Sequence, residues 1–298
     1  MPAPSDRPVW EREGADWPHR EASRFVAASG LTWHVQTFGS RDAPALLLLH
    51  GTGAATHSWR GLAPLLAQDF FVVAPDLPGH GFTDPLPAAR LSLPGMAAAI
   101  GELLSTLGVA PDIVVGHSAG AALLVRLCLD GLEPRHLVAL NGALTPFPGL
   151  AAVLFPGLAR MLFLNPVTPR LFAWTADRPA VERLIRGTGS RLDAQGLDLY
   201  RRLFRCPGHV GGALGMMANW DLATLDRALP RLTVPTTLVV GGDDLAISPD
   251  TAFALQKRLP HARVELLRNL GHLAHEEAPE TVARVIRQLS SSPAEAAS

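Results

Sequence analysis

Short, nearly uninterrupted apolar runs recur along the chain and alternate with longer segments whose apolar residues repeat every three or four positions. The runs ALLLLH at 45–50, FFVVA at 70–74 and DIVV at 112–115 each stop at a glycine or proline. Runs of this length are typical of strands buried on both faces of a parallel sheet. Residues 93–107 and 119–129 show helical spacing instead. This alternation predicts an α/β protein with a mostly parallel, doubly wound sheet.

The same rules extend the pattern toward both ends of the chain. Residues 23–39, SRFVAASGLTWHVQTFG, predict two strands joined by a turn at Ser29-Gly30. Further predicted elements are a helix at 59–68, strands at 137–140, 236–240 and 263–267, and helices at 249–259 and 276–289.

The alternation is interrupted between residues 143 and 229, where no convincing strand occurs. We expect this segment to form a helical cap over the carboxyl ends of the strands, where α/β proteins hold their sites. The predicted organisation is an α/β core of residues 23–142 and 230–290, a cap of 143–229, an N-terminal extension of 1–22 and a flexible tail of 291–298.

Composition narrows the classes of function. Of the 298 residues, 48% are hydrophobic and 18% are charged, and the formal net charge is -1. A nucleic-acid partner is not expected, because it would require a basic face. No apolar run reaches the length of a membrane span, and the polar start offers no signal peptide. The two cysteines form neither a disulfide framework nor a metal pattern. We expect a cytoplasmic protein without a metal or cofactor.

The strongest chemical signal is Gly116-His117-Ser118-Ala119-Gly120, which fits G-x-S-x-G between a predicted strand and a predicted helix. That context is the one a nucleophile elbow requires. The serine stands at a strained turn, so its neighbours two residues away must lack bulk. The alternative is a glycine-rich turn with an idle serine. The context favours Ser118 as a nucleophile.

A serine nucleophile needs a base, and the base needs an orienting acid. In this arrangement they follow the serine in the order Asp or Glu, then His. Asp244, just past the strand TTLVV, is the predicted acid, with Asp243 as the alternative; either could instead cap a turn. His272, in the loop after the last strand, is the predicted base. His275, beside two glutamates, is expected to be a capping or surface histidine.

The developing oxyanion needs two backbone donors. One is expected from Ala119, the residue after the nucleophile, and the other from the loop HGTG at 50–53. Within that loop Thr52 is the first choice and Gly53 the alternative.

Other polar residues near these motifs are expected to be structural. His50, His57 and His80 lack metal-ligand spacing and could tie loops together through ring hydrogen bonds. Asp76, in APDLPGHG, is expected to be a turn residue rather than a second acid.

Five segments in order, LLLLHGTG, APDLPGHGFTD, VVGHSAG, VVGGDDLAISP and NLGHLAHEEAPE, together resemble the α/β-hydrolase superfamily. Other segments, among them LSLPGMA, LNGALTPFPGLA, LNPVTPRLFAW and MMANWDL, resemble the magnesium-chelatase accessory proteins of bacteriochlorophyll biosynthesis. This second resemblance runs nearly end to end and includes the predicted cap, the region in which superfamily members diverge most.

The resemblance implies a role in photosynthesis, close to magnesium insertion into protoporphyrin IX. Implied partners are the magnesium chelatase subunits, and the implied location is the cytoplasm or the periphery of the photosynthetic membrane. It does not supply a reaction. The chain lacks the phosphate loop G-x-x-x-x-G-K-[ST], so it is not expected to be the chelatase ATPase.

Large apolar residues of the predicted cap point to a cleft facing the serine. Most are expected to form the cap's own core, and a subset should line the cleft. The candidate pocket residues are His117, Phe147, Phe155, Met216 and Trp220. Such a cleft suits a small apolar substrate or a tetrapyrrole, whose propionates an arginine of the cap could hold.

Two hypotheses of function follow. The first is an esterase-like serine hydrolase that acts on an apolar or tetrapyrrole-related substrate and is linked to magnesium insertion. The second is a non-catalytic accessory protein that keeps the hydrolase fold and binds a porphyrin or the chelatase.

Overall fold

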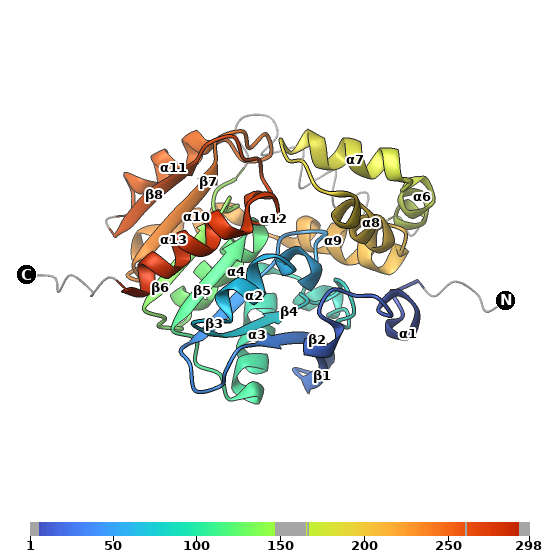
Figure 1. Cartoon of the computed structure of the whole chain (residues 1–298), viewed down its shortest axis with the longest axis horizontal. Helices are drawn as coiled ribbons and strands as arrows, with labels where there is room; N and C mark the ends of the chain where they lie inside the picture. Colours follow the sequence, from blue (N-terminus) through green and yellow to red (C-terminus); the bar gives the residue numbers. More distant parts are fainter. Residues whose placement is uncertain (1–5, 147–164, 166, 260, 292–298) are drawn as a thin grey trace, which may run out of the picture.

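An eight-stranded sheet runs through the middle of the molecule (Figure 1). The computed structural model describes residues 6–146, 165, 167–259 and 261–291. The strand order is β1-β2-β4-β3-β5-β6-β7-β8. The strands are β1 (Ser23–Ala28), β2 (Leu31–Phe38), β3 (Ala45–Leu49), β4 (Phe71–Pro75), β5 (Ile113–His117), β6 (His136–Leu140), β7 (Thr236–Gly241) and β8 (Ala262–Leu267).

Strand direction follows the predicted pattern. The pairs β1–β2 and β2–β4 are antiparallel, and every pair from β4 to β8 is parallel. The carboxyl ends of the parallel strands therefore meet at one edge of the sheet, where the loops that follow them can build a site.

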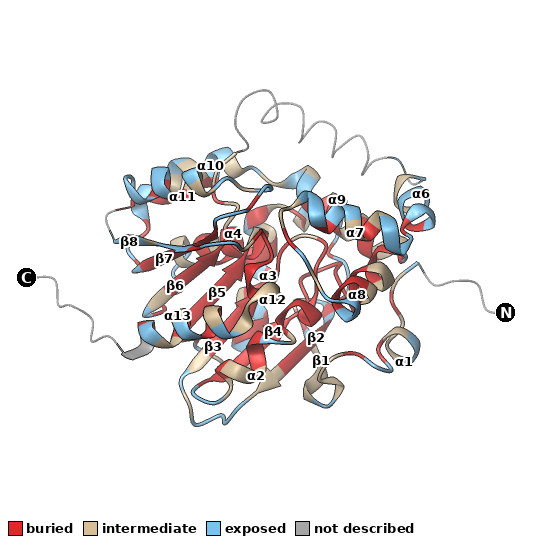
Figure 2. Cartoon of the chain, turned by 45° about the horizontal axis from the view of Figure 1, so that its top comes forward, coloured by how far each residue is buried: buried red, intermediate tan, exposed pale blue. Residues whose placement is uncertain are grey.

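The apolar runs fill both faces of this sheet. In β3, Leu47 and Leu49 pack in one core cluster, while Leu46 and Leu48 pack in another on the opposite face. Successive side chains of a strand point to opposite faces, so a strand covered on both sides must be apolar throughout. Figure 2 shows the central strands buried and the outer surfaces of the helices exposed.

Helices cover the two faces. Residues of α3 (Leu93–Leu107), α4 (Ala119–Leu129), α10 (Leu222–Ala228) and α11 (Pro249–Gln256) belong to the first cluster. Residues of α2 (Leu62–Leu66) and α13 (Pro279–Ser291) belong to the second. The predicted fold class, a doubly wound α/β sheet, is therefore confirmed.

The helix predicted at 276–289 is divided in two. The structure has α12 (Ala274–Glu277) followed by α13, with Ala278 outside the helical region at φ -142 and ψ 66. Pro279 causes the break, because a proline disfavours helical geometry at the residue before it and is accepted at a first helical position. The helix predicted at 59–68 is also shorter, with a 3-10 turn at Thr56–Trp59 before α2.

Between β6 and β7 the described residues form helices and no strand. These are α6 (Thr168–Thr175), α7 (Arg178–Gly187), α8 (Ala194–Phe204), α9 (Pro207–Asn219) and α10, and we call α6 to α9 the inserted helices. Asp177 and Asp193 begin α7 and α8 by accepting the N–H groups of Ala180 and Gly196. The inserted helices gather at one end of the molecule (Figures 1 and 2).

The remaining short elements join these layers. They are α1 (Trp10–Glu13) and 3-10 turns at Arg20–Ala22, Ala88–Arg90 and Leu229–Arg231. Trp17, which follows α1, is buried and donates its indole N–H to Thr56 Oγ1 at 3.0 Å. The described part of the N-terminal segment is thus packed against the loop after β3. Among the helices that the structure describes, none is both long enough and apolar enough to cross a bilayer.

Candidate active site

Ser118 lies at a sharp turn between β5 and α4. Its backbone has φ 51 and ψ -114, a conformation that non-glycine residues rarely adopt. A β-carbon at Gly116 would lie 2.5 Å from the backbone nitrogen of Ala121, and one at Gly120 would lie 2.0 Å from the carbonyl oxygen of Leu49. Both glycines are required by this close packing. The turn leaves Ser118 partly exposed at the carboxyl end of the central strand.

The loops after β7 and β8 bring a carboxylate and an imidazole together. His272 Nδ1 lies 2.8 Å from Asp244 Oδ2, and both residues are buried. A carboxylate can only accept, so Nδ1 carries the proton and Nε2 is left with a free lone pair. This is the tautomer that a general base needs. Asp243, the alternative acid, is exposed.

Asp244 is held by three further donors. Its Oδ1 accepts the backbone N–H groups of Ala246 at 2.8 Å and Ile247 at 2.9 Å. Its Oδ2 also accepts from the side-chain amide of Asn141 at 2.7 Å. Asn141 follows β6 directly with φ 47, and its contact with Asp244 was not evident from the sequence. An asparagine that follows a strand at the same sheet edge is the signal that could have identified it.

The loop that carries His272 is braced by the segment after α7. Thr188 accepts the backbone N–H groups of Leu245 at 3.1 Å and His272 at 3.3 Å. Ser190 Oγ accepts the N–H of Leu273 at 2.7 Å. The segment between α7 and α8 therefore contacts both the loop of Asp244 and the loop of His272, and no local sequence motif indicates this contact.

No hydrogen bond joins the Ser118 hydroxyl to His272 within the described residues. The turn and the loop that carry them are in contact, because the ring of His117, next to Ser118, lies 4.8 Å from the ring of His272, centroid to centroid. Contacts between a nucleophile and its base are often long without substrate and tighten when substrate binds.

Three backbone N–H groups are candidates for the oxyanion site. Ala119 is the first residue of α4, so its N–H has no acceptor within the helix. Thr52 and Gly53 donate no backbone hydrogen bond to any described residue. A β-carbon at Gly51 would lie 3.1 Å from Ser118 Cβ, which brings this loop against the nucleophile turn.

His275 is not at the surface, contrary to expectation. It is 1% exposed, its Nε2 lies 3.3 Å from Ser58 Oγ, and its ring lies 4.5 Å from that of His117. Burial lowers its pKa to about 3. A surface position was predicted for His275 because two glutamates follow it. One of them, Glu276, does not face solvent but pairs with Arg60 inside the protein.

Of the three histidines that were expected to tie loops together, only His50 uses both ring nitrogens in hydrogen bonds with described residues. His50 bridges two loops: its Nδ1–H donates to the carbonyl of Gly51 at 2.8 Å, and its Nε2 accepts the N–H of Leu77 at 2.9 Å. His57 does not do this, because neither of its buried ring nitrogens has a partner among the described residues. For His80, only Nδ1 is engaged, 3.2 Å from the carbonyl of Pro78.

Asp76, predicted to be a turn residue, is fully buried in the loop after β4. It accepts from His34 Nδ1 at 2.8 Å and from the N–H groups of Thr56 at 2.6 Å and Phe82 at 2.9 Å. Burial opposes its charge, but the neighbouring His34 and these donors keep the pKa of Asp76 below its ordinary value. In the described chain, no three His, Cys, Asp or Glu side chains come together as a metal site.

The predicted pocket residues have different positions. His117 is buried and donates from Nε2 to the carbonyl of His272 at 3.0 Å, and burial lowers its pKa. Met216 packs in the core cluster beside α3 and α4, with Trp220 half-buried against it. Phe147 and Phe155 lie outside the described residues.

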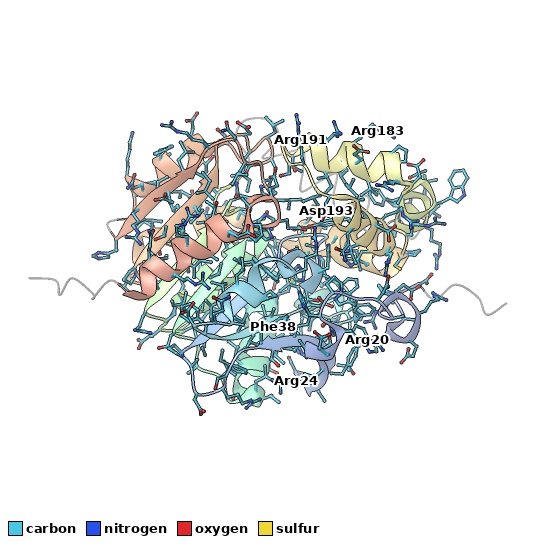
Figure 3. All side chains as sticks on the ribbon, in the orientation of Figure 1. Arg20, Arg24, Phe38, Arg183, Arg191 and Asp193 are labelled. Atoms are coloured by element: carbon cyan, nitrogen blue, oxygen red, sulfur yellow. The ribbon has the colours of Figure 1, made fainter. Side chains whose placement is uncertain are left out.

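The arginines of the inserted helices mostly face carboxylates or the exterior. Arg186 pairs with Glu182 at 2.7 Å, and Arg201 pairs with Asp198 at 2.7 Å. Figure 3 shows Arg183, on α7, and Arg191, in the segment after α7, at the outer edge of the molecule. None of these contacts directs an arginine toward Ser118.

Comparison with known proteins relates most of the chain to one family. The family described as alpha/beta hydrolase fold matches residues 44–279. The chain is 40% identical over 273 residues to the magnesium-chelatase 30 kDa subunit of Rhodobacter capsulatus, which covers 91% of this chain and 95% of that protein. It is also 26% identical over 280 residues to epoxide hydrolase 4 of Homo sapiens, covering 88% and 76% of the two chains.

Solved structures agree with the observed fold. The structure of the epoxide hydrolase CorEH without ligand superimposes with a TM-score of 0.76 and covers 90% of this chain and 97% of its own. Sequence identity in that pair is 24%, so the similarity concerns the fold alone.

Proposed function

The chain belongs to the α/β-hydrolase fold family, and from this premise we propose that it is an esterase-like serine hydrolase. Ser118 is the nucleophile, His272 the general base and Asp244 the orienting acid. The observation that carries the proposal is the His272–Asp244 contact of 2.8 Å, which leaves His272 Nε2 as an acceptor beside the strained turn of Ser118. The inserted segment 143–229 serves as the cap of this site.

The proposed reaction has two halves. Ser118 Oγ attacks the acyl carbon of an ester, and its proton passes to His272 Nε2. His272 then returns that proton to the leaving alcohol, which departs and leaves an acyl group on Ser118. In the second half, a water molecule attacks the acyl carbon and gives a proton to His272 Nε2. His272 then passes that proton to Ser118 Oγ as the bond to the acyl group breaks and the carboxylic acid is released.

Asp244 and the backbone donors stabilise the charges of these steps. The carboxylate holds His272 in one orientation and stabilises the imidazolium that forms. The N–H of Ala119, with that of Thr52 or Gly53, receives the oxyanion. The substrate class is an ester with an apolar acyl or alcohol part, tetrapyrrole esters included. The similarity to the magnesium-chelatase 30 kDa subunit favours a tetrapyrrole ester.

Turnover of short p-nitrophenyl esters tests this function. We expect Ser118→Ala to lower kcat/KM by about a million-fold if the three side chains act as a unit. Ser105→Ala, on the exposed side of α3, is the matched control and should keep the wild-type rate. A folded wild-type protein without turnover of any ester in the series would refute the hydrolase proposal.

A second function is favoured by the 40% identity to the magnesium-chelatase 30 kDa subunit. In this alternative the chain is an accessory protein of magnesium chelation and uses the fold to bind a porphyrin or the chelatase. Covalent chemistry at Ser118 would then be unnecessary.

Complementation separates the two functions. Wild-type chain and Ser118→Ala would each be expressed in Rhodobacter capsulatus that lacks its 30 kDa subunit, and bacteriochlorophyll would be measured. The hydrolase function predicts that only the wild type restores pigment. Equal restoration by Ser118→Ala would establish the accessory role instead.

A further inference from the structure

A histidine of the inserted helices reaches the loop of the proposed oxyanion site. We propose that His209, on α9, is a positioning residue that holds the loop of residues 50–54 in the shape needed to bind an oxyanion. This inference rests on the proposed hydrolase function, because it assigns a task to a residue outside the Ser118, His272 and Asp244 set.

Both ring nitrogens of His209 are used. Nε2 lies 3.0 Å from the carbonyl oxygen of Gly53, and Nδ1 lies 3.0 Å from the backbone nitrogen of Gly81. A carbonyl only accepts and an amide N–H only donates, so the ring is neutral with its proton on Nε2. His209 is 1% exposed, and burial lowers its pKa to about 4, which keeps it in this form at neutral pH.

The contact constrains the peptide groups that flank the candidate donors. His209 holds the carbonyl of Gly53, while the carbonyl of Gly51 accepts from His50 Nδ1 at 2.8 Å and from the N–H of Ala54 at 3.2 Å. A peptide group is planar, so holding the carbonyl of Gly51 also directs the N–H of Thr52 to the opposite side. The Thr52–Gly53 peptide then lies between two held neighbours, and both candidate N–H groups stay available.

His50 and His209 form equivalent bridges between the 50–54 loop and the loop after β4. Each donates to a carbonyl of the 50–54 loop and accepts an N–H from the loop after β4, Leu77 for His50 and Gly81 for His209. His50 belongs to the loop itself, whereas His209 comes from an inserted helix. The geometry of the loop therefore depends on the docking of α9.

The docking of α9 at this point is close. A β-carbon at Gly212 would lie 2.2 Å from the carbonyl oxygen of Gly79, so only glycine permits this approach. On the other side, the ring of Phe204 lies 3.3 Å from the position of a β-carbon at Gly53. The ring of His209 itself lies 5.3 Å from that of His80 and 6.2 Å from that of Phe204, centroid to centroid. Packing against neighbouring rings supports a precise positioning contact.

Three variants test the proposal in ester hydrolysis. His209→Leu removes both hydrogen bonds, and His209→Gln keeps one donor and one acceptor. Val210→Ala trims the adjacent buried side chain of α9 while His209 keeps both of its hydrogen bonds. An oxyanion contact exists only in the transition state, so its loss lowers kcat and leaves KM unchanged. We expect His209→Leu to lower kcat about 100-fold, His209→Gln to recover most of that loss, and Val210→Ala to keep the wild-type kcat.

Hydrogen exchange gives a readout that does not depend on activity. We expect His209→Leu to accelerate amide exchange in peptides covering residues 50–56 and 79–84, because Gly81 loses its acceptor and the Gly51–Ala54 turn loses its support. His209→Gln should exchange at nearly the wild-type rate. Exchange in α3 and α4 should not change in either variant.

The outcomes separate this inference from the function on which it rests. A wild type without esterase activity refutes the hydrolase, and with it the catalytic task of His209. An active wild type with unchanged kcat in His209→Leu overturns the inference and leaves the hydrolase intact. Equal losses in His209→Leu and Val210→Ala, without rescue by His209→Gln, would also overturn it, since they would indicate packing alone. Unchanged loop exchange in His209→Leu overturns it as well.

Discussion

Ser118 and Asn141 both have positive φ angles, 51 and 47, and both belong to the candidate site. Residues in this backbone region cost free energy and persist only where their surroundings hold them. Here the N–H of Ser118 donates to the carbonyl of Leu140, the residue before Asn141, at 2.9 Å, which ties the two turns together across β5 and β6. Two of the five non-glycine residues with positive φ in the described chain thus belong to the candidate site.

The proposed task of Asp244 is tested by Asp244→Asn. The amide can donate to His272 and would favour the wrong tautomer, so we expect kcat in ester hydrolysis to fall about 10,000-fold with little change in thermal stability. Asp243→Asn, at the exposed neighbour, is the control and should behave as wild type. A loss of less than tenfold in Asp244→Asn would exclude Asp244 as the orienting acid.

Asn141→Ala tests the second support of that carboxylate. A hydrogen bond to a charged group contributes about 1.5–3 kcal/mol, so its loss should lower kcat roughly 10- to 100-fold. We expect KM to stay near the wild-type value, because Asn141 is bonded to Asp244 rather than placed by any contact against substrate. Steady-state kinetics would check this, and an unchanged kcat would show that Asp244 is held without the amide.

The sequence was informative at this scale only where a local motif marks a residue. Ser118 stands in such a motif, and Asp244 and His272 follow strand ends in the expected order; the structure joins the last two by a hydrogen bond. Their catalytic roles remain predictions. Asn141 and His209 have no motif, because each contributes through a partner more than 100 positions away.

At the scale of elements, the turn from β5 to α4 depends on two glycines. We expect Gly120→Ala to destabilise the protein by several kcal/mol or to prevent folding, since its methyl group would lie 2.0 Å from the carbonyl oxygen of Leu49. Gly101→Ala is the matched control: in α3 its nearest neighbour is a Leu127 methyl group at 3.8 Å, so it should stabilise by about 0.5–1 kcal/mol. Chemical denaturation measures both, and an unaffected Gly120→Ala would contradict the described elbow.

Glu276 on α12 forms a buried ion pair with Arg60 and a hydrogen bond with Tyr200 of α8. Arg60 donates to Glu276 Oε2 at 2.6 Å, and Tyr200 on α8 donates its hydroxyl to Glu276 Oε1 at 2.7 Å. The side chain of Glu276 is 1% exposed, whereas that of Asp193, the other partner of Arg60, is 63% exposed. The carboxylate of Glu276 therefore joins three elements in the interior.

Removing one member of this pair should be costly. We expect Glu276→Leu to lower the free energy of unfolding by about 3–5 kcal/mol, because Arg60 loses its buried partner. Asp193→Asn keeps the helix cap and removes only an exposed charge, so it should cost less than about 1 kcal/mol. Chemical denaturation would give the free energy of unfolding of both variants, provided that the slopes of their curves are equal. Similar losses in the two variants would indicate that burial of Glu276 does not add to the stability of its ion pair.

Element boundaries were predictable where apolar spacing and stop signals coincide. The predicted helices 93–107 and 119–129 have the bounds of α3 and α4. Long-range effects explain the differences elsewhere. At Pro279 the apolar pattern continues through the proline and predicts one helix, whereas the proline ends α12 and begins α13. The contacts of the segment after α7 and of α9 with the site loops depend on tertiary packing, which local sequence does not encode.

At the scale of the whole molecule, the protein carries an unusual number of buried histidines. Eight of its eleven histidines are buried. Burial is the leading cause of a lowered pKa in six of them: His50, His57, His80, His117, His209 and His275. The folded protein thus holds these rings neutral in conditions where the unfolded chain would protonate them.

Stability should therefore fall with acidification. Between pH 6.5 and the lowered values, about 4 for His209 and about 3 for His275, the unfolded state binds more protons than the folded state. For His209 and His275, protonation of the unfolded chain lowers the free energy of unfolding by roughly 1.5–2 kcal/mol each between pH 6.5 and pH 5. Glu276, whose pKa burial raises to about 7, acts in the opposite direction but is a single group. We expect Tm to drop by several degrees, roughly 5 °C, from pH 7 to pH 5, and a constant Tm would contradict the buried neutral rings.

Covalent labelling of Ser118 shows whether this serine is a nucleophile. The wild-type protein would be treated with an alkyl fluorophosphonate and its intact mass measured, followed by peptide mapping, with Ser118→Ala treated in parallel. The account predicts one adduct per chain, located on Ser118 and absent from Ser118→Ala. A folded wild-type protein that acquires no adduct, or an adduct that persists in Ser118→Ala, would contradict it.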